Sequence, residues 1–114
     1  MTEKLHKIDP RQLAAERRTF DKLEPAIHSK ARLAIVSLLA ANPALTFTEL
    51  RDSLELTDGN LAAHLRALDA AGFIQQRRVN SRPKPTTSFA LSAAGRRAFV
   101  RYLEGLEALV KRHR

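Results

Sequence analysis

The stretch Thr46–Gly72, TFTELRDSLELTDGNLAAHLRALDAAG, predicts two short helices joined by a tight turn. Thr46 and Glu49 have the spacing of a capping box, in which two side chains satisfy free backbone amides at a helix start. Thr57 is placed to cap the second helix, because its hydroxyl can accept from an amide of the following turn. Gly72 stands where a left-handed residue ends a helix.

The second of these helices has two different faces. Leu61, Leu65 and Leu68 recur at i, i+4 and i+7, so they form one apolar stripe that we expect to be buried. The opposite face carries Gly59, Asn60, Ala63, Arg66 and Ala67. This face is small and polar, and it is suited to close approach to another molecule.

Charge points to a polyanionic partner. The net charge is +8 and the isoelectric point is about 10.8, values most often associated with nucleic-acid binding, although a merely soluble basic protein is the alternative. Between positions 60 and 90 the basic residues are Arg66, Arg77, Arg78, Arg82 and Lys84, against the single acid Asp69. The charge excess therefore falls on the proposed contact surface as well as on the chain ends.

Composition argues against several other classes. The 114 residues suggest one domain without a membrane-spanning run, and the absence of cysteine fits a reducing cytoplasm. None of the four histidines has a carboxylate or histidine partner at metal-site spacing, and no glycine-rich loop is present to cradle a phosphate. We expect no metal, no cofactor, no membrane association and no enzymatic activity.

Two helices are predicted before the central pair. Asp9-Pro10 begins a short helix on which Leu13 and Phe20 share a face, and this helix needs a packing partner such as a second subunit. Ser29 can cap a helix over residues 30–41, which is apolar nearly all round and is therefore expected at the centre of the fold.

After Gly72 the pattern becomes strand-like. Residues 73–79 and Thr86–Leu91 predict an antiparallel hairpin, with Arg82 and Lys84 in the loop between the strands. Arg77 and Arg78 lie on alternate faces of the first strand. One of them is expected to reach the backbone of a bound nucleic acid while the other is only solvated, but the pattern does not say which.

The last segment predicts a long helix from the cap Ser92 to about residue 111. Phe99, Leu103, Leu106 and Val110 follow a 4-3-4 spacing typical of a coiled-coil seam, and Tyr102 and Leu109 widen it. One side of this helix is expected to pack on its own domain and the other on a partner.

Together these segments resemble a known family. HSKARLAIVSLLA (28–40), the run from Thr46 to Ile74, TTSFALS (86–92) and AAGRRAFVRYLEGLEALV (93–110) are similar to small bacterial and archaeal winged-helix transcriptional regulators of the broad MarR/ArsR-like group. The resemblance implies a mainly α fold with a small β-hairpin wing. It divides the chain into an arm and helix (1–24), a winged helix-turn-helix domain (25–91) and a dimerisation helix (92–114).

The resemblance implies a cytoplasmic homodimer that binds double-stranded DNA, with residues 58–71 as recognition helix and residues 80–85 as wing. Asn60 could pair with an adenine edge, Arg66 with guanine or a phosphate, and Ala63 with a thymine methyl. The candidate DNA contacts are Thr48, Thr57, Gly59, Asn60, Ala63, His64, Arg66, Ala67, Arg77, Arg78, Arg82 and Lys84. The candidate dimer contacts are Leu13, Phe20, Phe99, Tyr102, Leu103, Leu106, Leu109 and Val110.

Two other functions compete with this interpretation. A winged-helix module could bind an acidic protein surface, or the last helix could lie on a membrane. The small polar face around Asn60 favours DNA, because protein-binding surfaces more often display aromatic anchors, and the last helix lacks tryptophan. A crevice between the dimer interface and the DNA-binding lobes could bind a small-molecule effector, but no set of residues identifies which one. The Cys/His patterns of metal-sensing relatives are absent.

Overall fold

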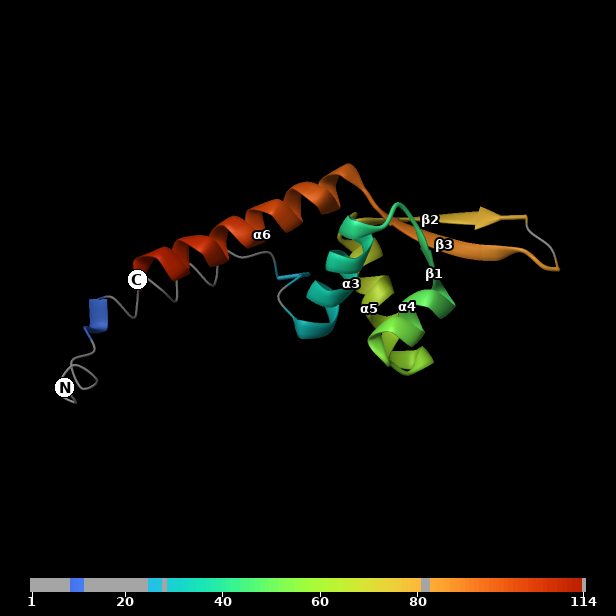
Figure 1. Cartoon of the computed structure of the whole chain (residues 1–114), viewed down its shortest axis with the longest axis horizontal. Coiled ribbons are helices and arrows are strands. Elements are labelled where there is room, and N and C mark those ends of the chain that lie inside the picture. Colours follow the sequence, from blue (N-terminus) through green and yellow to red (C-terminus); the bar gives the residue numbers. More distant parts are fainter. Residues whose placement is uncertain (1–8, 12–24, 28, 81–82, 114) are drawn as a thin grey trace.

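The computed structural model describes residues 9–11, 25–27, 29–80 and 83–113 (Figure 1). The elements are α3 (Lys30–Ala41), β1 (Leu45–Thr46), α4 (Phe47–Leu54), α5 (Asp58–Ala70), β2 (Ile74–Val79), β3 (Thr86–Leu91) and α6 (Ala93–Arg112). This arrangement confirms the predicted class, a mainly helical winged helix-turn-helix. Of the predicted helix that begins at Asp9-Pro10, only residues 9–11 are described, and Leu13, Phe20 and the wing residue Arg82 lie outside the described residues.

The wing belongs to a three-stranded antiparallel sheet with the order β1-β3-β2. The predicted hairpin is formed by β2 and β3, and β1 adds a third strand in which Leu45 pairs with Phe89 and Thr46 with Ser88. The sequence did not predict β1, because a two-residue strand is too short to show any alternation of apolar and polar residues.

Helix α3 is central, as its composition predicts. It contacts α4, α5, α6 and β3. The buried core is drawn from α3, α4, α5 and α6, from both wing strands and from two residues between elements: Ile27, Ile35, Val36, Leu39, Leu50, Leu61, Leu65, Leu68, Phe73, Ile74, Phe89, Ala98 and Tyr102. This core fixes the orientation of α5 and of the wing relative to each other.

The predicted helix starts are confirmed at the level of individual hydrogen bonds. The side chains of Ser29, Thr46, Thr57 and Ser92 accept from the backbone amides of Arg32, Glu49, Asn60 and Gly95, respectively. The Glu49 carboxylate also accepts from the Thr46 amide at 2.8 Å, which completes the capping box. Gly72 adopts the expected left-handed conformation, with φ of 78°.

The start of α6 is attached to the turn that follows α5. The Ser92 backbone N–H donates to the Phe73 carbonyl at 3.0 Å, and the Ser92 hydroxyl donates to the Gly72 carbonyl at 2.6 Å. From this point α6 projects away from the body on the side opposite the wing (Figure 1). Across the described residues, no helix is long and apolar enough to span a membrane.

Candidate nucleic-acid interface

The leucine stripe of α5 faces the core. Leu61 and Leu68 are 0% exposed and Leu65 is 4% exposed, which confirms the predicted burial. Helix α5 contacts α3 and α4, and the three leucines belong to the buried core that the helices share. Its opposite side is therefore turned outward and held in place by the core.

The outward side of α5 agrees with the predicted face at every residue except one. Gly59, Asn60, Ala63 and Arg66 are exposed, and Ala67 is half-buried. A methyl group added at Gly59 would meet no other atom within 4 Å. The surface is therefore open and low in relief, and Asn60 and Arg66 supply its two long polar groups.

The polar groups of this face are available. The Asn60 backbone N–H donates to the Thr57 hydroxyl at 3.1 Å, so the cap uses the backbone and not the side chain. Over the described part of the chain, the Asn60 side-chain amide has no hydrogen-bond partner and Arg66 has no carboxylate partner. Both groups can therefore bind an external partner without first breaking an internal contact.

The turn between α4 and α5 is held by Arg51, a residue that the sequence pattern alone does not indicate. Its guanidinium contacts Asp58 and Asp52, each at 3.1 Å. The hydrogen bond to Asp58, followed by that to Asp52, raises the pKa of Arg51 above its ordinary value. The contact keeps a positive charge between two carboxylates that would otherwise repel an approaching phosphate. Glu55, which ends α4, is the one described non-glycine residue with a positive φ, 53°.

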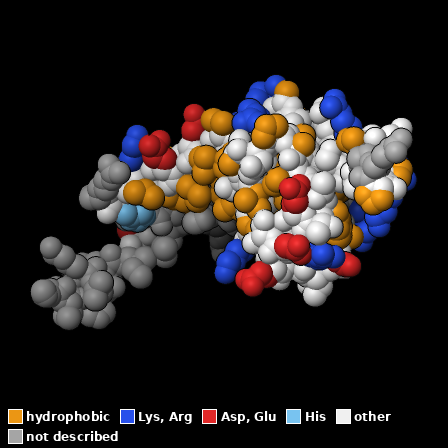
Figure 2. Space-filling view, turned by 45° about the vertical axis from the view of Figure 1, so that its right-hand side comes forward, with side chains coloured by type: hydrophobic (Ala, Val, Ile, Leu, Met, Phe, Trp, Pro, Cys, Tyr) orange, Lys and Arg blue, Asp and Glu red, His pale blue; other side chains and the backbone are white. Residues whose placement is uncertain are grey.

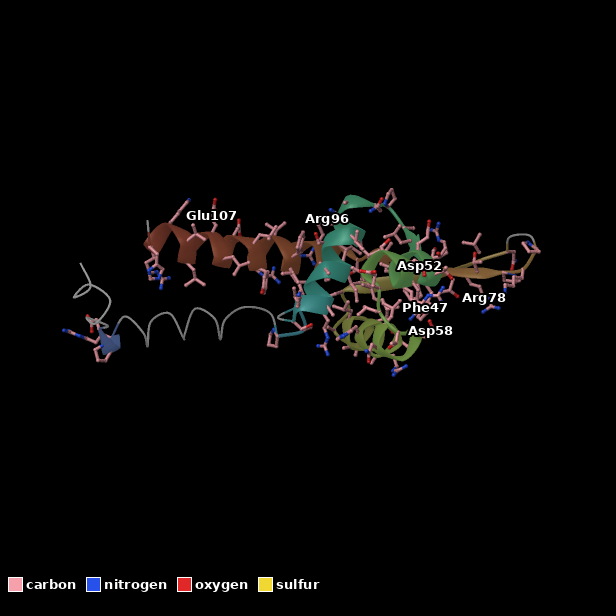
Figure 3. The ribbon with its side chains drawn as sticks, turned by 60° about the horizontal axis from the view of Figure 1, so that its bottom comes forward. Phe47, Asp52, Asp58, Arg78, Arg96 and Glu107 are labelled. Atoms are coloured by element: carbon pink, nitrogen blue, oxygen red, sulfur yellow. The ribbon has the colours of Figure 1, made fainter. Side chains whose placement is uncertain are left out.

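The register of the wing assigns each arginine to a face. Gln76 pairs with Phe89, Arg77 with Ser88 and Arg78 with Thr87. Because directly paired residues point to the same face, Arg78 shares the face of the buried Phe89, whereas Arg77 lies on the opposite face. Figure 3 shows Arg78 at the wing.

An open hollow separates the start of α4 from the wing. It has a volume of about 640 Å³ and is lined by Thr46, Phe47, Thr48, Gln76, Thr86, Thr87 and Phe89. Hydroxyl groups are common donors to DNA phosphates. Of the other predicted contacts, Thr48, Thr57 and Lys84 are exposed, while His64 is half-buried and receives a hydrogen bond from Arg32 at 3.2 Å.

The candidate dimer residues divide into two groups. Tyr102 and Leu109 are buried within the single chain, at 6% and 9% exposed, which leaves them little surface for a partner. Leu103 and Val110 are 45% and 55% exposed, and Phe99 and Leu106 are half-buried beside them. Figure 2 shows apolar side chains continuing along α6 away from the body. Val100 is another exposed apolar residue of α6, and it lies outside the 4-3-4 spacing from which the seam is predicted.

No three His, Cys, Asp or Glu side chains within the described ranges are grouped to hold a metal ion. The interface is made instead of a small-residue helix face, single amide and guanidinium groups, and a basic wing.

Comparison with known proteins identifies the family. A family model described as a winged helix DNA-binding domain matches residues 31–110. The chain belongs to the winged helix DNA-binding family. Protein MJ0432 of Methanocaldococcus jannaschii is 32% identical over 84 residues, which cover 74% of this chain and 91% of that protein. This family is one of DNA-binding proteins, in agreement with the expectation that the chain is not an enzyme.

Solved structures agree with this assignment. A transcriptional regulator homologue from Pyrococcus horikoshii OT3 is 26% identical with a TM-score of 0.77, and the match covers 85% of this winged-helix chain and 95% of that one. A regulator of the MarR family from Enterococcus faecalis V583 is 19% identical with a TM-score of 0.65, covering 94% and 90% of the two chains. The second likeness concerns the fold alone. The winged-helix resemblance seen in the sequence is thus confirmed.

Proposed function

We propose that this winged-helix protein is a homodimeric, cytoplasmic transcriptional regulator that reads a specific sequence in double-stranded DNA. Helix α5 enters the major groove and the wing contacts the minor groove or the backbone. The observation that carries the proposal is the exposed face of α5, where Asn60 and Arg66 have no internal partner in the described chain and small residues allow close approach. An amide and a guanidinium on a groove-sized helix are the groups that read base edges.

Asn60 and Arg66 have separate roles in this proposal. The Asn60 amide donates to and accepts from an adenine edge, and Arg66 donates to guanine. Gly59 and Ala63 permit the helix backbone to approach the bases, and Ala63 contacts a thymine methyl. Thr48, Thr57 and the wing residues bind phosphates and fix the register of the helix on the duplex.

The test of sequence reading is selection of bound duplexes from a random pool at physiological salt, followed by Arg66→Ala. We expect the variant to lose about 1–3 kcal/mol on the selected duplex, to lose far less on a scrambled one, and to show relaxed selection at one position. Asp69→Asn, about one turn further along α5, changes the net charge by one unit in the opposite sense, and we expect it to strengthen binding to the selected and scrambled duplexes equally. An equal loss on selected and scrambled duplexes would refute base reading by Arg66.

The neighbouring wing arginines Arg77 and Arg78 provide a matched pair of variants. Arg78 shares the face of Phe89 and Gln76, so we propose that it contacts the DNA backbone and that Arg77 does not. We expect Arg78→Ala to weaken binding to all duplexes by about tenfold and to reduce the salt slope by about 1, and Arg77→Ala to have little effect. Both variants remove one positive charge from neighbouring positions. The reverse order of effects, measured by fluorescence anisotropy, would assign the contact to Arg77.

Salt dependence distinguishes this function from a protein-interaction module. Neutralising several phosphates makes log affinity fall linearly with log salt concentration, with a slope of about −0.9 for each phosphate contacted. A slope near zero on a random-sequence duplex, together with an empty selection, would favour binding of an acidic protein surface by the basic wing.

A further inference from the structure

Arg32 of α3 and His64 of α5 are joined by a side-chain hydrogen bond between the two helices. The Nε–H of Arg32, in the first turn of α3, donates to Nδ1 of His64 in α5 at 3.2 Å. The Arg32 backbone N–H is itself held by the Ser29 cap at 3.1 Å, so the base of this side chain is fixed at the helix start. No carboxylate in the described chain pairs with Arg32.

The direction of this hydrogen bond fixes the proton on His64. A guanidinium has donors only, so Nδ1 of His64 must carry a lone pair. A neutral imidazole that accepts at Nδ1 holds its proton on Nε2, which lies across the ring and points away from Arg32. Arg32 therefore turns His64 into a donor with a defined direction.

The Nε2–H group reaches the molecular surface. Among the described residues, no buried side-chain nitrogen or oxygen lacks a hydrogen-bond partner. Nε2 of His64 has no such partner, so it is not one of the buried atoms. Nε2 is therefore in contact with solvent, although the His64 ring as a whole is half-buried. The two terminal nitrogens of Arg32 also have no partner in that part of the chain.

The position of His64 on α5 indicates which part of a bound duplex lies next to the Arg32–His64 pair. His64 follows Asn60 by one helical turn, so both lie on the same side of α5. A helix in the major groove has a phosphate backbone along each of its flanks, and residues beside the base-reading centre face those phosphates. Arg32 and His64 together present a cation and a directed N–H on such a flank.

We propose that Arg32 and His64 form a phosphate clamp, in which His64 Nε2–H and the Arg32 guanidinium bind one DNA phosphate beside the recognition helix. Arg32 has two functions in the clamp, since it supplies charge to the phosphate and sets the tautomer of His64. This inference rests on the proposed DNA-binding function. It adds a residue of α3 to the interface and gives His64 a defined chemical state.

The tautomer is tested in the free protein. Two-bond proton–nitrogen NMR spectra at mildly alkaline pH, where imidazoles are neutral, distinguish a protonated Nε2 from a protonated Nδ1. We expect a single Nε2–H tautomer in the wild type and a mixture in Arg32→Met, which keeps the length of the stem and removes all donors. A mixture in the wild type would overturn the proposal at its first step.

The clamp is tested by titration of a random-sequence duplex of about two helical turns (~20 base pairs). We expect Arg32→Met and His64→Leu each to weaken binding by about tenfold and to lower the salt slope, because each disrupts the same phosphate contact. The double variant should lose little more than either single one. If the contact between Arg32 and His64 were merely structural, its loss in either variant would lower the unfolding midpoint and leave the salt slope of DNA binding unchanged.

Lys30→Met is the matched control. Lys30 is exposed in the same turn of α3 and loses the same charge, but among the described residues its side chain has no hydrogen bond or ion pair with α5. Equal losses in Lys30→Met and Arg32→Met would overturn the clamp in favour of general electrostatics. If Arg32→Met does not fold, Arg32→Lys, which keeps the charge and one donor group, should retain the tautomer and most of the affinity, and loss of both would overturn the clamp.

The two proposals fail in different ways. Wild-type levels of binding by Arg32→Met and His64→Leu, with Arg66→Ala still impaired, would remove the clamp and leave the DNA-binding function standing. Absence of salt-dependent duplex binding by the wild type would remove both.

Discussion

Replacement of Gly95 by alanine is expected to lower the free energy of unfolding by about 2–3 kcal/mol, although alanine normally favours a helix over glycine. An added Cβ would lie 2.1 Å from the Phe73 carbonyl oxygen and 2.9 Å from its carbon. The obstacle is backbone, and it is held in place because the same oxygen accepts from the Ser92 N–H at 3.0 Å. Relief of the clash therefore requires α6 to move off the turn after α5.

The measurement is urea unfolding followed by circular dichroism, with Gly59→Ala as control. Gly59 is also a helical glycine, but a Cβ there would meet nothing within 4 Å, and we expect no loss of stability and a gain of up to about 1 kcal/mol. Equal midpoints for the two variants would show that the Gly95–Phe73 approach is looser than the structure indicates. A retained midpoint for Gly95→Ala with a reduced slope would point to a change in compactness.

This contact explains two motifs that the sequence presents separately. Gly72 and Phe73 follow the recognition helix, whereas Ser92 and Gly95 follow the wing, and the structure joins them through two hydrogen bonds and one close backbone approach. The sequence predicts Ser92 as a cap and Gly72 as a left-handed residue, because both are local effects. It does not predict their contact, since pairing of distant turns leaves no periodic signal.

The same distinction between predictable local structure and unpredictable tertiary contacts applies to the candidate interface. The inward turn of Leu61, Leu65 and Leu68 follows from helical spacing alone and is confirmed. The face taken by Arg78 depends on strand register, and the link from Arg32 to His64 depends on how α3 crosses α5. Both are tertiary facts. Short local patterns in one sequence cannot determine them.

Helix α6 shows most clearly that a local apolar pattern does not determine which of its residues are buried. The 4-3-4 spacing correctly predicts an apolar seam, but not how the seam is divided between the chain's own core and its outer surface. Tyr102 is buried in the core, and Leu103, its neighbour in sequence, is 45% exposed. A rotation of 100° separates consecutive helical residues, so a small shift in how α6 lies on α3 decides which of them faces outward.

Leu103→Glu is expected to dissociate the proposed homodimer and to weaken binding to a duplex with two half-sites by about 10²-fold or more. Leu103 and Val110 form the exposed edge of the seam, and a carboxylate placed there would be desolvated on association without a partner. The fold should persist, because Leu103 lies outside the buried core. Sedimentation at micromolar concentration measures the dimer, and fluorescence anisotropy measures DNA binding.

Ala108→Glu provides the matched control, since it adds the same charge to an exposed position of α6 on the side away from the seam. We expect this variant to remain dimeric and to bind DNA nearly as the wild type does. Loss of the dimer in both variants would implicate net charge instead of the seam. A dimeric Leu103→Glu that still binds two half-sites would move the interface to another surface of the chain. Binding of a single half-site should be almost unchanged in Leu103→Glu, because dimerisation joins two DNA-binding units without altering the contacts that either unit makes.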